Sequence, residues 1–134
     1  MIKQLAHICI HTTDLDATAH FYGDGLGLER GYEFIKDGKL FGYYIKLGNN
    51  TFIEVFSGEP GVEGNIRHVA IEVEDIDAVI SRLRAHGYEA GNKSFGGDQA
   101  WQAWTTDPSG VRIEFHQYTE NSLQLTGGTC LVDW

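Results

Sequence analysis

The chain has 134 residues and a net charge of −9, with ten Lys and Arg residues against nineteen Asp and Glu residues. This length is typical of one domain, and so acidic a composition argues against nucleic-acid or anionic-membrane binding, which both need basic surfaces. No apolar run approaches the roughly 20 residues of a membrane span, and the N-terminus lacks the apolar core of a signal peptide. We therefore expect a cytoplasmic protein whose two cysteines are reduced thiols.

The first half of the chain predicts a strand, a helix and three more strands. Residues 5–11 alternate between apolar and polar side chains, as a strand does. A helix should begin at Thr13 or Asp14 and run to about Tyr22, where a series of glycines ends it. The remaining strands are expected at 32–34, 41–47 and 51–56, with turns at 36–39 and 48–50.

The second half predicts the same order of elements. An alternating strand at 67–73 precedes an amphipathic helix from about 75 to 86, which Gly87 stops. Residues 58–65 form a linker between the halves, and 91–99 form a glycine-rich loop. Further strands are expected near 88–90, at 100–106 and at 111–118, with a turn at 107–110.

The two halves also share sequence. HICIHTTDLDATAHFY, which begins at His7, resembles HVAIEVEDIDAVISRL, which begins at His68, 61 positions later (68 − 7). TFIEVF and VRIEFH match in the same way, and place Glu54 60 positions before Glu114 (114 − 54). Two matches at nearly one spacing indicate a duplicated module. We therefore expect an α+β fold of two tandem βαβββ modules, about 3–57 and 66–118, within a single domain of residues 1–134 that has a tail at 119–134.

The alternation of side chains across a strand puts polar groups on one face of each module. His7, Glu54, His68 and Glu114 each lie on the polar face of a strand whose other face is apolar. Imidazole and carboxylate groups are good ligands for divalent metals, so these four residues are candidate metal ligands. The alternative is a solvated sheet face that carries charged residues without a function. The repeat, and Phe52 and Phe56 on either side of Glu54, argue against that alternative.

The chain resembles the vicinal oxygen chelate superfamily, which includes glyoxalase I, extradiol dioxygenases and bleomycin-resistance proteins. The similar segments are LAHICIHTTDLDATAHFYGDGLGLE, NTFIEVF, IRHVAIEVEDIDAVISRLRAHG and TTDPSGVRIEFHQY. The resemblance implies paired modules whose sheet curls around one divalent ion (nickel, zinc, cobalt, manganese or iron(II)), with His7, Glu54, His68 and Glu114 as its ligands. It also implies a homodimer in which His7 and Glu54 of one chain meet His68 and Glu114 of the other.

A glyoxalase-like lyase or isomerase is the activity that this resemblance favours. The metal would chelate two neighbouring oxygens of a small substrate and stabilise an enediolate, while Glu114 or Glu54 moves the proton. Glu54 argues against the dioxygenases and fosfomycin-type thiol transferases, which use two His and one Glu, but both remain alternatives. A ligand-sequestering module of the bleomycin-resistance kind is the third. His11 stands where glutathione-dependent members carry an arginine, which favours a different substrate.

Other side chains on the polar faces are candidates for substrate binding. They are His11, Arg112, His116, Phe52 and Phe56. Arg112 could hold a carboxylate or phosphate, or could instead pair with Glu72 across the sheet.

Overall fold

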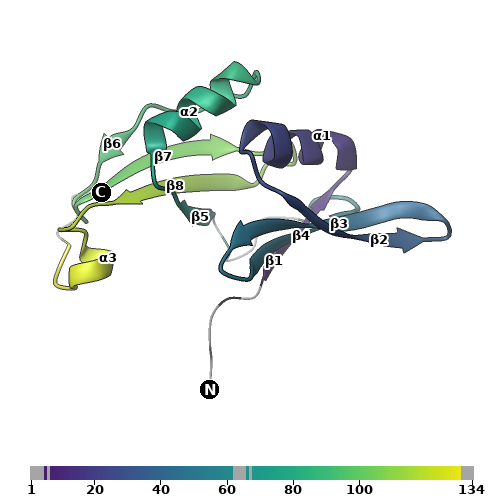
Figure 1. The fold of residues 1–134 in the computed structure, drawn as a ribbon, viewed down its shortest axis with the longest axis horizontal. Coiled ribbons are helices and arrows are strands. Elements are labelled where there is room, and N and C mark those ends of the chain that lie inside the picture. The colour runs from purple at the N-terminus through teal and green to yellow at the C-terminus, as the bar shows by residue number, and fades with distance from the viewer. Residues whose placement is uncertain (1–4, 6, 62–65, 67, 131–134) are drawn as a thin grey trace. The chain divides into compact units, whose positions relative to one another are not determined.

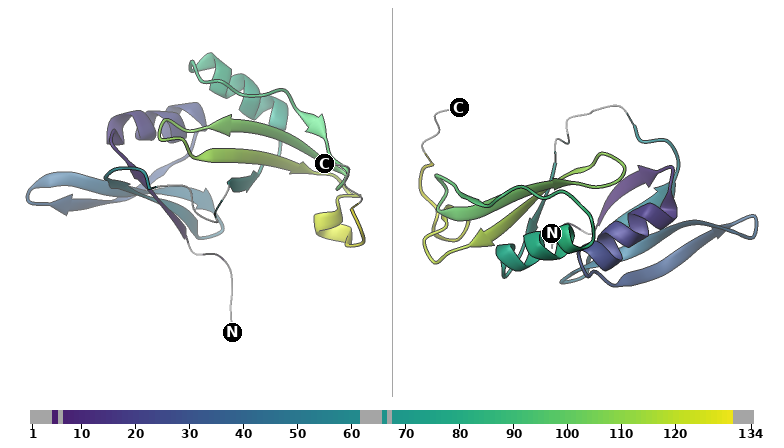
Figure 2. Two further views of the ribbon diagram at one scale, coloured as in Figure 1. Left: turned by 180° about the vertical axis from the view of Figure 1, so that it is seen from behind. Right: turned by 90° about the horizontal axis from the view of Figure 1, so that it is seen from above.

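The computed structural model describes residues 5, 7–61, 66 and 68–130. The chain forms two compact units, Met1–Gly64 and Asn65–Trp134. Both units appear in Figures 1 and 2.

The first unit is a four-stranded mixed sheet with one helix. Its strands lie in the order β1-β4-β3-β2, where β1 is parallel to β4 and the other neighbours are antiparallel. The elements are β1 (His7–Thr12), α1 (Leu15–His20), a π-helical turn (Phe21–Gly25), β2 (Arg30–Lys36), β3 (Lys39–Gly48) and β4 (Thr51–Ser57).

Local sequence signals explain the ends of these elements. The Asp14 side chain accepts a hydrogen bond of 2.9 Å from the backbone N–H of Ala17, which caps α1 as predicted. Asp37 and Gly38 both have positive φ, 51° and 73°, as the tight hairpin between β2 and β3 requires. The helix predicted to reach Tyr22 instead continues as the π-helical turn to Gly25.

The second unit repeats this arrangement, with strand order β5-β8-β7-β6 and β5 parallel to β8. Helix α2 lies along one face of the sheet, and a short helix, α3, lies beyond the end of β8 (Figure 1). The elements are β5 (Val69–Glu72), α2 (Ile76–Ala85), β6 (Ser94–Phe95), β7 (Ala100–Thr106), β8 (Arg112–Tyr118) and α3 (Leu123–Thr126).

The prediction of a strand near 88–90 is wrong, and the strand that follows α2 is instead β6, at Ser94–Phe95. Side chains take up the carbonyl groups that a strand would use in its ladder. The Arg84 guanidinium donates to the Ala90 carbonyl at 2.7 Å, and the Thr105 hydroxyl donates to the Glu89 carbonyl at 2.7 Å. The segment therefore runs beside β7 as an irregular chain rather than as a ladder partner.

Each unit buries the apolar face of its sheet beneath its helix. In the first unit, Ile53 and Val55 of β4 are buried, and the Tyr43 hydroxyl reaches the Leu15 carbonyl at 2.7 Å. In the second, Ile113 and Phe115 of β8 are buried together with Ile76, Ile80 and Leu83 of α2. The polar face of each sheet is consequently the face turned away from its helix.

The predicted α+β class, with two tandem βαβββ modules, is confirmed. Among the described residues, no helix is long and apolar enough to cross a membrane.

Candidate metal centre

His7 and Glu54 lie together in the first unit, and we call this pair the first half-site. Strands β1 and β4 run side by side, with Cys9 opposite Glu54. The Nε2 atom of His7 lies 3.8 Å from Oε1 of Glu54. The sequence therefore placed this His/Glu pair on one face correctly.

Tyr44 of β3 completes the surroundings of the first half-site. It lies opposite Glu54 in the β3–β4 register, and its hydroxyl is 3.3 Å from Nδ1 of His7. Hydrogen bonding to Tyr32, followed by burial and the Glu54 carboxylate, raises the pKa of the Tyr44 phenol well above its ordinary value. The phenol thus stays protonated and can donate to His7 Nδ1, which leaves Nε2 free for a ligand.

Cys9 shares the polar face with this pair. Partial burial is the first cause that raises the pKa of its thiol, and a hydrogen bond and charge repulsion from Glu54 add to it. The thiol is therefore held neutral and is not an activated nucleophile.

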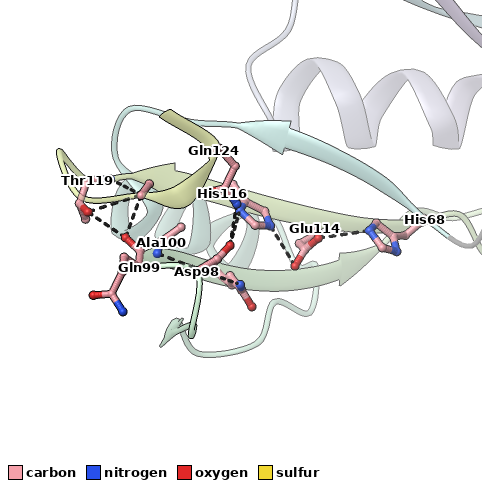
Figure 3. A network of polar contacts seen from close by, with 10 residues as sticks. His68, Asp98, Gln99, Ala100, Glu114, His116, Thr119 and Gln124 are labelled. Atoms are coloured by element: carbon pink, nitrogen blue, oxygen red, sulfur yellow. Dashed lines mark hydrogen bonds and ion pairs between the residues drawn. The ribbon is translucent and has the colours of Figure 1, made fainter. Parts of the chain in front are cut away.

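His68 and Glu114 form the second half-site, in the second unit (Figure 3). The Nε2 atom of His68 lies 3.2 Å from Oε2 of Glu114. Glu114 is only 8% exposed although it lies on the polar face. Trp104 lies opposite it in the β7–β8 register, and its ring meets the His68 ring edge-on with centroids 5.0 Å apart.

His116 is the third polar side chain on this face of β8. Its Nε2 atom is 3.0 Å from Oε1 of Glu114, so Glu114 lies between two imidazoles. Asp98 lies on the far side of His116, with Oδ2 3.9 Å from Nδ1 (Figure 3). The sequence suggested His116 as a substrate contact, but the structure places it against Glu114.

The two half-sites correspond position by position. Tyr44 and Trp104 are 60 residues apart (104 − 44), and each lies opposite the glutamate of its own unit. The glutamates also face equivalent residues on the parallel strand, Cys9 and Ala70. Tyr44 was missed from the sequence, although the spacing that pairs the two glutamates also pairs Tyr44 with Trp104.

The donor atoms of each half-site fit a divalent ion. Two donors bound at about 2.1 Å each, with an angle of roughly 90–110° between them, lie about 3.0–3.4 Å apart. The His68–Glu114 separation of 3.2 Å falls within that range, and the His7–Glu54 separation of 3.8 Å needs a small side-chain rotation. Within the described residues, no group of three or more His, Cys, Asp or Glu side chains could hold a metal ion. Each half-site thus supplies two ligands, fewer than such an ion needs.

A row of aromatic rings, which we call the aromatic strip, lies beside the first half-site. Its rings pack against one another, with centroids 4.4 Å apart for Tyr32 and Tyr44, 4.7 Å for Phe34 and Phe56, and 5.3 Å for Tyr44 and Phe52. Tyr32 is 57% exposed. The wall beside Glu54 is therefore apolar, and it includes Phe52 and Phe56, the two phenylalanines chosen from the sequence.

Arg112 lies away from Glu72, contrary to the pairing considered from the sequence. In the strand register His116, and not Arg112, lies opposite Glu72. Arg112 lies at the other end of β8, opposite Thr106 of β7. The Arg112 guanidinium instead stacks on Trp104, 4.5 Å from the ring centroid. A shallow cavity of about 260 Å³ is lined by Arg112, Trp104 and Glu89 among others. His11 lies on the polar face of β1, four residues beyond His7. Its ring is edge-on to that of Phe56, with the ring centroids 6.5 Å apart.

Comparison with known proteins agrees with this architecture. Residues 4–115 match the model of the Glyoxalase/Bleomycin resistance protein/Dioxygenase superfamily. The chain belongs to this superfamily, and the predicted resemblance is confirmed.

Individual relatives are diverse in what they do. An uncharacterised Escherichia coli protein, YaeR, is 29% identical in an alignment 128 residues long, and the match covers 87% of this chain and 97% of YaeR. The fosfomycin resistance protein FosX of Listeria monocytogenes, solved with Mn(II) and a dihydroxypropylphosphonic acid, is 24% identical with a TM-score of 0.71, covering 92% of this chain and 98% of FosX. TnmS3, an antibiotic binding protein from Streptomyces sp. CB03234, is 20% identical with a TM-score of 0.69. The match covers 88% of this chain and 98% of TnmS3. These likenesses establish the fold, and they include both a metal-bound protein and a binding protein.

Proposed function

We propose that the protein is a metal-dependent lyase or isomerase of the glyoxalase-like type, which moves a proton beside a carbonyl of a small substrate. One observation carries the proposal: each unit presents a His/Glu pair at equivalent strand positions, with Nε2 and a carboxylate oxygen 3.8 and 3.2 Å apart. His7, Glu54, His68 and Glu114 would hold the ion. When bound, a divalent ion supplies Lewis acidity to neighbouring substrate oxygens.

The chain's own residues would do the rest of the work. A carboxylate, Glu54 or Glu114, accepts the proton from the carbon beside the carbonyl and returns it to a neighbouring atom. Phe52 and Phe56 of the aromatic strip contact the apolar part of the substrate and exclude water. Arg112, stacked on Trp104, binds an acidic group if the substrate carries one. His11 lines the far end of the first unit's polar face.

We further propose that the two half-sites meet between chains of a homodimer. Each unit offers two ligands, so a complete set of two imidazoles and two carboxylates needs one unit of each kind. A two-fold dimer that brings the first unit of one chain to the second unit of the other forms two identical sites. The ion in each site is nickel, zinc, cobalt, manganese or iron(II), which all accept nitrogen and oxygen ligands.

The proposed activity is tested by following proton exchange. The protein is loaded with each of the five metals in turn and incubated in deuterated water with 2-oxoaldehyde–thiol adducts and with α-hydroxycarbonyl compounds. We expect at least one substrate to incorporate deuterium beside its carbonyl, and a chelator to stop the exchange. Absence of exchange with every metal would contradict the proposal.

The alternatives predict different results in the same samples. Oxygen consumption with a catechol would indicate a dioxygenase, and consumption of fosfomycin with a thiol would indicate a transferase. The sequestering module is favoured by one observation, the exposed aromatic strip, because stacked rings can bind a flat ligand without chemistry. Ligand binding that is unchanged by a chelator would identify that function.

A further inference from the structure

The two oxygens of Glu114 face different partners. Oε2 lies 3.2 Å from His68 Nε2, while Oε1 lies 3.0 Å from His116 Nε2 (Figure 3). Oε2 is thus directed to His68, the other member of the second half-site, and Oε1 contacts His116 on the opposite side. A carboxylate bound at both ends has little freedom to rotate, and Glu114 is 8% exposed.

An anchored carboxylate lies on the other side of the His116 ring. Asp98 Oδ2 lies 3.9 Å from His116 Nδ1, and Nδ1 is buried with no hydrogen-bond partner among the described residues. The Asp98 side chain accepts hydrogen bonds from the Ala100 backbone at 3.3 Å, from Gln102 Nε2 at 3.2 Å and from Gln124 Nε2 at 2.6 Å. The imidazole therefore lies between two carboxylates, of which the outer one is fixed by three donors.

The segment after β8 belongs to this support. The Leu123 backbone donates to the Asp98 carbonyl at 2.9 Å, and the hydroxyl groups of Thr119 and Ser122 each donate to the Gln99 carbonyl at 2.8 Å. Through these bonds the segment that contains α3 binds the loop before β7. The C-terminal segment thus reaches the second half-site through Gln124, Asp98 and His116.

The first half-site has no histidine at the position equivalent to His116. The residue that corresponds to His116 in the first unit is Phe56, 60 positions earlier (116 − 56), and its ring packs against other rings of the aromatic strip. The polar neighbours of Glu54 are His7 at 3.8 Å, the Cys9 thiol and the Tyr44 phenol, so no second imidazole contacts its carboxylate among the described residues. The two half-sites are therefore chemically unequal although their ligand types are the same.

We propose that His116 is a positioning residue, which fixes Glu114 for the metal through Oε1 and is oriented in turn by Asp98. This inference rests on the proposed function, because it assumes that Glu114 is a metal ligand. It distinguishes Glu114, which a second imidazole supports, from Glu54, where Phe56 stands at the position equivalent to His116. Outer hydrogen bonds of this kind typically contribute 10- to 100-fold to metal affinity.

Two substitutions at one position test the proposal. His116→Phe copies the residue of the first unit and keeps a flat ring, so the fold should survive, but it removes the donor to Glu114. His116→Gln keeps an N–H donor near the place of Nε2. Cobalt(II) affinity is measured by competition with a chromogenic chelator, and the visible spectrum of bound cobalt reports the ligand geometry. We expect about 10- to 100-fold weaker binding and an altered spectrum for His116→Phe, and recovery of both in His116→Gln.

His20→Phe is the matched control, because His20 is an exposed residue of α1 outside both half-sites. It should bind cobalt as the wild type does, and circular dichroism should show all three variants folded. Wild-type affinity and spectrum in His116→Phe would overturn the positioning role while leaving the proposed function intact. Equal losses in both His116 variants would also overturn it, since the donor would then be irrelevant. Failure of the wild type to bind cobalt would overturn the proposed function and this inference together.

Discussion

Glu114→Gln is expected to weaken metal binding by about 100-fold or more, because it removes a charged ligand as well as the carboxylate oxygen that faces His116. The amide has nearly the same size, so the buried position keeps its packing. An amide nitrogen directed at His68 or His116 cannot accept from either ring. Turnover should fall below detection at metal concentrations that saturate the wild type.

Competition with a chelator gives the affinity, and thermal unfolding of the metal-free protein shows whether the fold is retained. Glu120→Gln is the matched control, since Glu120 is an exposed residue just beyond β8. It should leave affinity unchanged. A Glu114→Gln protein that is folded and binds metal like the wild type would remove Glu114 from the ligand set.

Gly42→Ala is expected to destabilise the fold by about 3 kcal/mol, near the upper end of the usual cost of overpacking. Gly42 lies opposite Phe56 in the β3–β4 register, and a methyl group there would meet the Val55 carbonyl oxygen at 2.2 Å and the Phe56 ring at 2.6 Å. A backbone oxygen cannot move aside as a flexible side chain can. The substitution should therefore separate β3 from β4 locally and displace Phe56 from the aromatic strip.

Urea denaturation measures the effect, as a lower midpoint at an unchanged slope. Gly61→Ala provides the comparison, because no described residue other than its chain neighbours has an atom within 4 Å of its added methyl group. Its midpoint should match that of the wild type. Equal midpoints for Gly42→Ala and Gly61→Ala would show that the sheet accommodates the methyl group, contrary to the register described above.

Strand periodicity and the internal repeat were enough to predict the position of each His/Glu pair. Alternation put His7 and Glu54 on one face and Ile53 on the other, and the structure buries Ile53 as expected. The same reasoning placed Glu114 on the polar face of β8. These residues were predictable because each lies in a regular strand, where the position along the chain fixes the side-chain direction.

Features that depend on loops were not predictable in this way. Asp98 lies in the glycine-rich segment before β7, where no periodicity indicates a direction, and its partners Gln102 and Gln124 come from separate parts of the chain. The strand expected near 88–90 was wrong because Arg84, a residue of α2, binds the Ala90 carbonyl. Side-chain capture of a backbone group leaves no periodic signal in the sequence.

The contact between His116 and Glu114 was also not predictable from the sequence. The sequence placed it on the polar face, which is correct, but could not show that Glu114 lies within 3.0 Å of it. Contact between neighbours on one face depends on side-chain rotamers, which the strand pattern leaves open. The inequality of the two half-sites is therefore a property of the folded structure.

The claim that one ion is held jointly by both half-sites is tested most directly by counting metal in the purified, metal-loaded protein. The samples are the wild type, His7→Ala, His68→Ala, and an equal mixture of the two variants refolded together. We expect about one ion per chain in the wild type and almost none in either variant. The mixture should recover about a quarter of the wild-type content, since half of randomly paired dimers are mixed and each has one intact site of two. Full metal content in either variant, or no recovery in the mixture, would contradict a site shared between the half-sites of two chains.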